Sequence, residues 1–102
     1  MSLSRFFILL VLHRQPLHGY EITKQVAGLT NGCCAPTEGS LYPVLKEFTD
    51  AGLLSLLSQV VSGRERKVYT LTPLGEQAWQ VASQAWGEVA DYILKAIINN
   101  NA

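Results

Sequence analysis

The sequence predicts an α+β fold that is mostly helical: a winged helix-turn-helix of three helices with a two-stranded wing, followed by one long C-terminal helix. Three observations support this fold class. Residues 37–54 place apolar side chains at helical spacing, and two short strand-like runs joined by a basic turn follow directly. Residues 73–99 then repeat apolar side chains at heptad spacing. Helix, strand, basic hairpin and strand is the element order of a winged helix-turn-helix.

Length and composition narrow the class of protein. A chain of 102 residues forms one domain with one core, and a content of 48% apolar and 16% charged residues predicts surface reserved for a second subunit. Eight basic and eight acidic residues cancel, which argues against a purely electrostatic, histone-like DNA binder. Residues 1–72 hold seven basic and five acidic side chains, and residues 73–102 hold one and three. This asymmetry favours a basic DNA-facing end and an acidic dimerisation end.

The first predicted helix covers residues 4–13 and is apolar almost all round, so it should be buried on several sides. We expect one side to pack on its own domain and another, through Phe6 and Leu9, to contact the long helix of a second subunit. Pro16 breaks the chain after this helix. Because the sequence has no apolar run of 18 residues or more and no small-residue cleavage site after this helix, we expect a cytoplasmic, nucleoid-associated protein without a membrane span.

The second predicted helix covers residues 18–27, with Tyr20, Ile22 and Val26 as its core contacts and Gly28 marking its end. His18 stands at its start without a set of ligands at metal-binding spacing, so a capping or surface role is favoured over a metal site. We expect neither a metal nor a cofactor.

Residues 29–35 are predicted to form a turn, and they carry the only two cysteines of the sequence, Cys33 and Cys34. Adjacent cysteines form a disulfide only through a strained ring, and no Cys-x-x-Cys or nearby His completes a zinc set. Two interpretations stay open. The pair is either two small side chains packed in a turn or a thiol sensor whose modification reorients the helix that follows.

The helix predicted within residues 37–54 is the candidate recognition helix. Thr37 is suited to cap its start, Gly52 is suited to end it, and Leu41, Val44, Leu45 and Phe48 form its buried stripe. Pro43 inside the helix predicts a mild kink. The opposite face is thin enough to enter a major groove. It consists of Ser40, Pro43, Lys46 and Glu47. The alternative is an ordinary amphipathic core helix.

The predicted wing consists of strands at residues 55–61 and 67–71 and a turn at residues 62–66. Tyr69 and Leu71 share one face at period two, and we expect this face to meet the core. Arg64, Arg66 and Lys67 concentrate positive charge near the tip. In a wing, such a cluster favours contact with phosphates or the minor groove, although a basic hairpin tip can also be a solvated turn.

The last predicted helix runs from Pro73, capped by Thr72, to about residue 99, with residues 99–102 as a frayed tail. At about 1.5 Å per residue it is roughly 40 Å long, too long to be covered by a domain of this size. A two-fold dimer is the simplest way to cover its apolar seam. The seam consists of Trp79, Ala82, Trp86, Val89, Ile93 and Ala96.

Four blocks of the sequence stand out together. They are His18-Gly19-Tyr20-Glu21-Ile22, Gly39-Ser40-Leu41-Tyr42-Pro43-Val44-Leu45, Ala51-Gly52-Leu53-Leu54, and Gly63-Arg64 followed by Val68-Tyr69-Thr70-Leu71-Thr72-Pro73-Leu74-Gly75. In this order and spacing they resemble the PadR family of bacterial transcriptional regulators, and the resemblance covers almost the whole chain. The single C-terminal helix is similar to the shorter branch of that family, in which pairing of this helix makes the dimer.

The resemblance also bears on an effector site. Some PadR-like dimers place a tryptophan in the middle of the last helix, where it stacks on flat hydrophobic ligands between the subunits. This implies Trp86, with Trp79 beside it, as the contact for a flat hydrophobic small molecule. The alternative is that both tryptophans only fill the seam. Cys33 and Cys34 are the second candidate effector site, and the family pattern lends this pair no support.

The sequence holds no nucleotide-binding, nucleophile-elbow or paired acid–base motif, so we expect a protein that is not an enzyme. We predict a homodimeric repressor that binds an inverted repeat in double-stranded DNA, with two recognition helices about 34 Å apart, and that a small molecule or a thiol-directed signal releases. The predicted DNA contacts are Thr37, Glu38, Ser40, Tyr42, Pro43, Lys46, Arg64, Arg66 and Lys67. The predicted dimer contacts are Phe6, Leu9, Trp79, Ala82, Trp86, Val89 and Ile93.

We therefore divide the chain into a DNA-binding part, residues 1–72, whose first helix also serves the dimer, and a dimerisation helix, residues 73–102. Two alternatives of other kinds stay open: a winged-helix DNA-binding adaptor in plasmid partitioning, and a dimeric protein-interaction module that has lost DNA binding.

Overall fold

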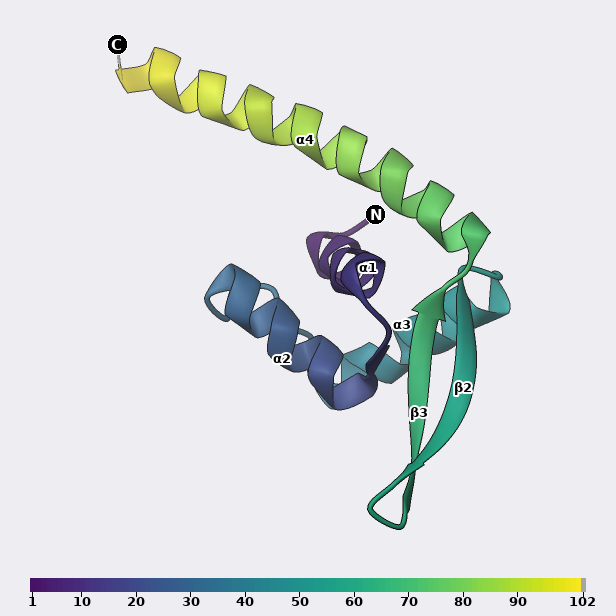
Figure 1. Ribbon diagram of the computed structural model, residues 1–102. Helices are drawn as coiled ribbons and strands as arrows, with labels where there is room; N and C mark the ends of the chain where they lie inside the picture. Colours follow the sequence, from purple (N-terminus) through teal and green to yellow (C-terminus); the bar gives the residue numbers. More distant parts are fainter. Residues whose placement is uncertain (102) are drawn as a thin grey trace.

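The computed structural model of the protein describes residues 1–101, with side chains for residues 1–100. These residues form helices and one hairpin with an added short strand, and most of the chain is helical, which confirms the predicted fold class (Figure 1). The elements follow in the order α1 (Leu3–Arg14), β1 (Leu17–His18), α2 (Gly19–Thr30), α3 (Glu38–Asp50), β2 (Leu54–Val61), β3 (Arg64–Leu71) and α4 (Pro73–Asn101).

The strands form one antiparallel sheet in the order β1-β3-β2. β2 and β3 pair along their full length, from Leu54 opposite Leu71 to Val61 opposite Arg64, and make the long hairpin that projects from the domain in Figure 1. The predicted wing is therefore correct, but a third strand, β1, pairs with β3 through Leu17 and Tyr69. Its two residues are too few to show a period-two pattern in the sequence.

The hairpin is tighter than predicted. Only Ser62 and Gly63 form the turn, and both have positive φ angles, 53° and 77°, as in the two-residue turns that suit the twist of paired strands. β3 consequently begins at Arg64, so the basic residues expected in a loop at 62–66 belong to a strand, where successive side chains point to opposite faces.

The core forms around α1, which lies between α2 and α4 (Figure 1). A helix that is apolar on several sides can pack against several neighbours at once, and Ile8, Leu9, Val11 and Leu12 are all buried. Leu9 has no exposed surface within its own chain. It therefore belongs to the core and not to the surface on which we had expected a second subunit.

α2 departs from its prediction in two ways. The helix runs through Gly28 to Thr30 and ends where Asn31 and Gly32 adopt left-handed backbone angles, with φ of 51° and 79°. Ile22 and Val26 are buried as expected, but Tyr20 is 70% exposed. Because Tyr20 precedes Ile22 by two residues, it lies on the opposite face of the helix.

α3 begins and ends as the sequence predicts. The Thr37 hydroxyl accepts a hydrogen bond from the Ser40 amide at 3.3 Å, and Gly52 follows the end of the helix with a φ of 80°. Leu41, Leu45 and Phe48 are buried, while Val44 is half-buried. An ion pair of 2.7 Å between Arg5 Nη1 and Glu47 Oε2 joins α1 to α3, and Arg5 lowers the pKa of the Glu47 carboxyl.

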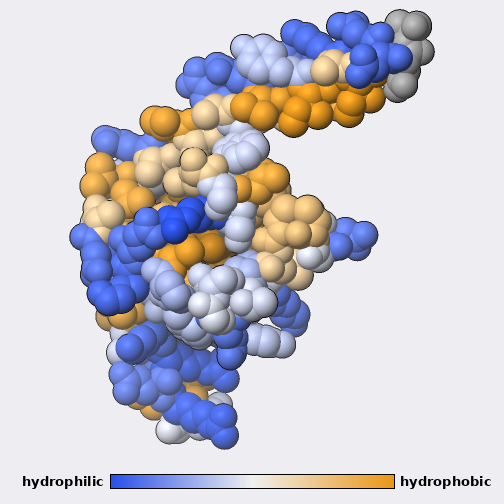
Figure 2. Space-filling view, turned by 180° about the vertical axis from the view of Figure 1, so that it is seen from behind, coloured by the Kyte–Doolittle hydropathy of each residue, from blue (hydrophilic) through white to orange (hydrophobic). Residues whose placement is uncertain are grey.

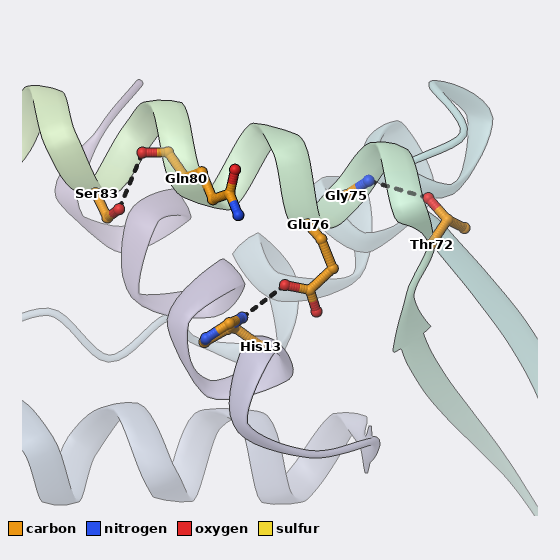
Figure 3. A network of polar contacts seen from close by, with 6 residues as sticks. All are labelled: His13, Thr72, Gly75, Glu76, Gln80 and Ser83. Carbon is orange, nitrogen blue, oxygen red and sulfur yellow. Dashed lines mark hydrogen bonds and ion pairs between the residues drawn. The ribbon is translucent and has the colours of Figure 1, made fainter.

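The first turns of α4 are fixed to the domain. The Thr72 hydroxyl accepts a hydrogen bond from the Gly75 amide at 3.0 Å, and His13 Nδ1 lies 2.6 Å from Glu76 Oε2 (Figure 3). The Trp79 ring stacks with Phe6 and His13 at centroid distances of 5.5 and 4.8 Å. These contacts attach α4 to α1.

Beyond Trp86 the side chains of α4 are exposed, and the helix projects from the domain with apolar residues along one side and polar residues along the other (Figure 2). It continues to Asn101, so the tail predicted at residues 99–101 is helical instead of frayed, and Ala102 lies outside the described residues. Among the described residues, no helix combines the length and the apolar character needed to cross a membrane.

Candidate nucleic-acid interface

α3 and its cap carry the predicted DNA contacts of the recognition helix on an exposed face, except that Glu47, also expected on this face, is paired with Arg5 of α1. Thr37, Glu38, Ser40, Pro43 and Lys46 are exposed. The Ser40 hydroxyl donates to the Thr37 carbonyl oxygen at 3.1 Å, so it is held against the first turn while an oxygen lone pair stays available. The face thus offers two hydroxyl groups, a carboxylate, an ammonium group and the small apolar surface of Pro43, and hydroxyl, carboxylate and ammonium groups can all contact base edges.

Lys46 is held by a neighbour on its own helix. Its ammonium nitrogen lies 2.7 Å from Asp50 Oδ2, one turn further along, and hydrogen bonding to this carboxylate raises the pKa of Lys46. Lys46 therefore keeps its charge, but it must leave Asp50 or share its protons to reach a nucleic acid.

Tyr42 packs against the start of α2. The atoms nearest to where a Cβ at Gly19 would stand are the Tyr42 hydroxyl oxygen, at 2.7 Å, and two ring carbons, at 3.1 Å. Only glycine therefore allows the ring to lie this close. Tyr42 nevertheless remains 48% exposed, so part of its side chain is accessible beside the recognition face.

The wing divides its cations between two faces. Alternation along β3 puts Arg64 and Arg66 on one face and Lys67 on the other, together with the buried Tyr69. Arg66 Nη1 lies 3.3 Å from His18 Nε2, which itself lies 2.8 Å from Glu21 Oε1. Arg66 and Lys67 nevertheless line the same groove beside the start of α2, whereas Arg64, next to the hairpin turn, does not line it.

Two grooves connect the wing to the helices. One, of about 340 Å³, separates α3 from β3 and has Tyr42, Lys46 and Lys67 on its walls. The other, of about 410 Å³, lies between the start of α2 and β3, with His18, Tyr20 and Arg66 on its walls. Tyr42, Lys67 and Tyr69 line both grooves, so the recognition face and the wing border one continuous concave surface.

Sequence reasoning missed the contribution of α2 to this surface. His18 caps α2, as expected, and also lines the groove between α2 and β3. Tyr20, expected in the core, lines the same groove, and Lys24 lines a neighbouring groove beside Arg66. The signal was present in the helical phase. Ile22 and Val26 are buried, and Tyr20 and Lys24 each precede one of them by two residues. Tyr20 and Lys24 therefore lie on the opposite, outward face of the helix.

The two tryptophans differ in what surrounds them. Trp79 is occupied by its stacking with Phe6 and His13 inside the chain. Trp86 lies between two apolar grooves on either side of α4, one of about 510 Å³ reaching Leu74 and one of about 380 Å³ reaching Phe7 and Ile93. Trp86 is therefore the better placed of the two to meet a hydrophobic ligand or another protein chain.

Of the predicted dimer contacts, Phe6 and Trp86 are half-buried, and Val89 and Ile93 are 40% and 53% exposed. Ala82 is buried against its own domain, as Leu9 is. The exposed members continue along one side of α4 as the apolar stripe visible in Figure 2. It includes Leu94, Ile97 and Ile98, each more than half exposed.

The cysteines lie in the turn between α2 and α3 as free thiols with their sulfur atoms 2.6 Å apart. Cys33 is exposed and Cys34 half-buried. The hydrogen bond with Cys33 raises the pKa of the Cys34 thiol. In the part of the chain that the structure describes, no group of three or more His, Cys, Asp or Glu side chains gathers in a way that could hold a metal ion.

Comparison with known proteins bears on this arrangement. A sequence profile of the transcriptional regulator PadR-like family matches residues 8–81. The negative transcriptional regulator PadR of Bacillus subtilis is 29% identical in an alignment of 102 residues. The alignment covers 94% of this chain and 56% of that protein. The chain thus spans about half the length of this relative.

Solved structures share the fold. A PadR family transcription regulator from Clostridium difficile superimposes with a TM-score of 0.81 at 26% identity, covering 94% of this chain and 99% of the other. Bacillus subtilis PadR in complex with operator DNA superimposes with a TM-score of 0.71 at 30% identity, covering 78% of this chain and 45% of the other.

Proposed function

Because the chain belongs to the PadR-like family of transcriptional regulators, we propose that it is a homodimeric repressor that binds an inverted-repeat operator in double-stranded DNA. The family and its curated relatives are transcriptional regulators and not enzymes. The observation that carries the proposal is the continuous concave surface bordered by the exposed face of α3 and the basic wing. The operator-DNA complex of the Bacillus subtilis relative supports it. A bacterial cytoplasm, at the nucleoid, is where such a protein would act.

In this proposal α3 enters the major groove. Ser40, Pro43 and Lys46 face the base edges, because they occupy the outermost positions of the helix, while Thr37, Glu38 and Tyr42 stand at the level of the sugar–phosphate backbone. Arg64 and Arg66 contact phosphates or the minor groove. Lys67, on the opposite face of β3, contacts the backbone from the groove beside α3.

The dimer forms through α4. Residues 73–102 act as the dimerisation helix and residues 1–72 as the DNA-binding part, with Phe6 of α1 contributing to the interface. The support is the apolar stripe beyond Trp86, because an apolar helix face of this length is stable in water only when another surface covers it. The interface we propose consists of Phe6, Trp86, Val89 and Ile93. Leu9 and Ala82 are left out because their own domain buries them, and Trp79 because it stacks with Phe6 and His13 of its own chain.

Release from DNA follows from a signal at one of two places. A flat hydrophobic small molecule beside Trp86 would lie between the subunits and change the angle between the two α4 helices. A thiol-directed signal would act at Cys33 and Cys34, next to the start of α3.

Protection mapping of the DNA upstream of the protein's own gene tests the operator. We expect two protected half-sites about 10 base pairs apart from centre to centre, or a multiple of that spacing. Protection of clustered direct repeats would instead favour a partitioning adaptor, and absence of protection anywhere, with no affinity for DNA of mixed sequence, would contradict DNA binding.

Substitutions then test the assignment of residues. Arg64→Ala/Arg66→Ala should weaken binding to operator and unrelated DNA alike and flatten the salt dependence, which we expect to reflect about 4–6 phosphate contacts per dimer. Ser40→Ala and Lys46→Ala should change the preferred base sequence instead. Lys95→Ala removes one positive charge from the exposed side of α4 beside Asp91, and it is the charge-matched control for Lys46→Ala. A wing variant that binds DNA like the parent would show that the wing does not touch DNA.

A further inference from the structure

The turn between α2 and α3 brings the two cysteines into contact. Their sulfur atoms are 2.6 Å apart, and Cys33 is exposed to solvent. They are also the only cysteines of the sequence. A reagent in solution can therefore reach two converging sulfur atoms at one place on the molecule and nowhere else.

The backbone around the pair is held on the side of α2. The Thr30 hydroxyl donates to the Val26 carbonyl oxygen at 2.8 Å and accepts from the Cys34 amide at 3.2 Å. The Cys33 amide donates to the Thr30 carbonyl oxygen at 3.1 Å. The backbone that carries the two sulfur atoms is thus tied to the last turn of α2.

The connection from the pair to the recognition helix is short and stiff. Ala35 packs against the core, Pro36 is buried, and Thr37 caps α3. Proline fixes its own φ angle and restricts the residue before it. A shift of the backbone at Cys34 is therefore transmitted to Thr37, the cap of α3, because the residues between them have little conformational freedom.

We propose that Cys33 and Cys34 form a dithiol site for a monosubstituted trivalent arsenical, whose arsenic atom bridges the two sulfur atoms. In the reaction, an arsenical R–As(OH)₂ condenses with both thiols. Two S–H bonds and two As–O bonds break, two As–S bonds form, two water molecules leave, and arsenic stays trivalent. The effect on DNA rests on the proposed function: the bridge draws the turn into a ring and lowers the affinity of α3 for the operator.

The geometry selects this ligand over other partners of thiols. A structural zinc ion is bound by four ligands, and among the described residues no third His, Cys, Asp or Glu side chain lies near the pair. A linear two-coordinate mercury ion would need its sulfur atoms on opposite sides, whereas these two lie side by side. Pyramidal trivalent arsenic takes two sulfur atoms at adjacent corners, and its softness suits thiol ligands.

Oxidation of the pair to a disulfide is the other reaction to consider. It proceeds through a thiolate and closes a strained ring between neighbouring residues. The hydrogen bond with Cys33 raises the pKa of Cys34, so the thiol form is favoured at neutral pH. A disulfide also needs a two-electron oxidant, whereas condensation with the arsenical changes no oxidation state and closes a larger ring through the arsenic atom.

The binding part is tested on the full, reduced chain with phenylarsine oxide, followed by intact mass. We expect one adduct per chain that survives excess 2-mercaptoethanol and is removed by the dithiol 2,3-dimercaptopropanol. Cys33→Ser and Cys34→Ser each keep one thiol, so their adducts should be lost to 2-mercaptoethanol. The absence of an adduct on the parent chain, or an equally resistant adduct on either single variant, would overturn the site.

The regulatory part is tested with operator DNA. Phenylarsine oxide should weaken operator binding by the parent at least tenfold and leave Cys33→Ser/Cys34→Ser unchanged, with circular dichroism confirming that both proteins stay folded. A stable adduct with unaltered operator affinity would overturn the coupling. If the unmodified parent binds no DNA, the proposed function fails, while the mass measurement still decides the dithiol site.

Discussion

Two glycines in and after α2 differ in backbone conformation. Gly28 lies inside the helix, exposed and with open space around it, whereas Gly32 follows the helix with a φ of 79°. The sequence suggested that Gly28 would end the helix, because glycine is a common stop signal. In the structure Asn31 and Gly32 perform that role. Local sequence cannot choose between two nearby glycines when the packing of Ile22 and Val26 carries the helix past the first.

Gly28→Ala should stabilise the protein by about 0.5–1 kcal/mol, because alanine loses less conformational entropy than glycine in a helix. Gly32→Ala should destabilise it by about 1–2 kcal/mol, because a side chain is disfavoured at a left-handed backbone angle. Urea unfolding of both variants measures the difference. A loss of stability in Gly28→Ala would mean that the helix does not continue through this position.

The contact between Gly19 and Tyr42 predicts an effect on DNA binding without direct contact. Gly19→Ala should push the Tyr42 ring aside and weaken operator binding by about 1 kcal/mol, roughly fivefold, if the Tyr42 hydroxyl contacts a phosphate. Tyr42→Phe should lose the same hydroxyl. In the double variant the two losses should not add, because they act through one group. Additive losses would show that Gly19 acts by another route.

The ion pair between Arg5 and Glu47 predicts a pH dependence of stability. Arg5 lowers the pKa of Glu47 in the folded chain, so the pair stabilises the protein above the unfolded pKa of a glutamate, about 4.3, and this contribution is lost as the pH falls through the lower folded value. Glu47→Gln should therefore melt below the parent at pH 7, and the difference should disappear in acid. Glu88→Gln, on exposed α4, is the control for charge alone.

Among the elements, those with strong local signals were predicted and those that depend on partners were not. The caps of α3 and α4 followed from Thr37 and Thr72, because a hydroxyl acts on amides within three residues of itself. β1 could not be predicted from its two residues, since only pairing with Tyr69 and Val68 makes them a strand. For the same reason Arg64 and Arg66 appeared to belong to a loop until their pairing with β2 placed them in β3.

For the candidate interface, the exposed positions of α3 were predicted, but the neighbours of these residues in space were not. Helical phase put Ser40, Pro43 and Lys46 on the outer face of α3, where the structure has them. The neighbours that modify them come from elsewhere in space: Gly19 beneath Tyr42, and His18 beside Arg66. Contacts between segments about 20 to 50 residues apart are tertiary, and no local pattern encodes them.

For the whole molecule, the decisive question is what covers the far half of α4. Ile93→Glu places a charge in the apolar stripe and should convert the proposed dimer to monomers and abolish operator binding, while the circular dichroism of the domain is kept. Gln84→Glu adds the same carboxylate at an exposed position outside the apolar stripe and should change neither property. Sedimentation velocity distinguishes the two. A parent protein that sediments as a monomer at micromolar concentration would contradict the dimer.

The attachment of α4 also has a mechanical consequence. Its base is fixed to α1 by Glu76 and Trp79, while residues 87–100, about 21 Å of helix, are exposed. Because α4 is held only near its start, a small rotation there displaces its far end: a tilt of about 5° would move the last turn by roughly 2 Å over that length. Substitutions at this attachment, such as Phe6→Leu, should therefore shift the spacer length that a paired molecule tolerates between half-sites, even though they lie far from any nucleotide.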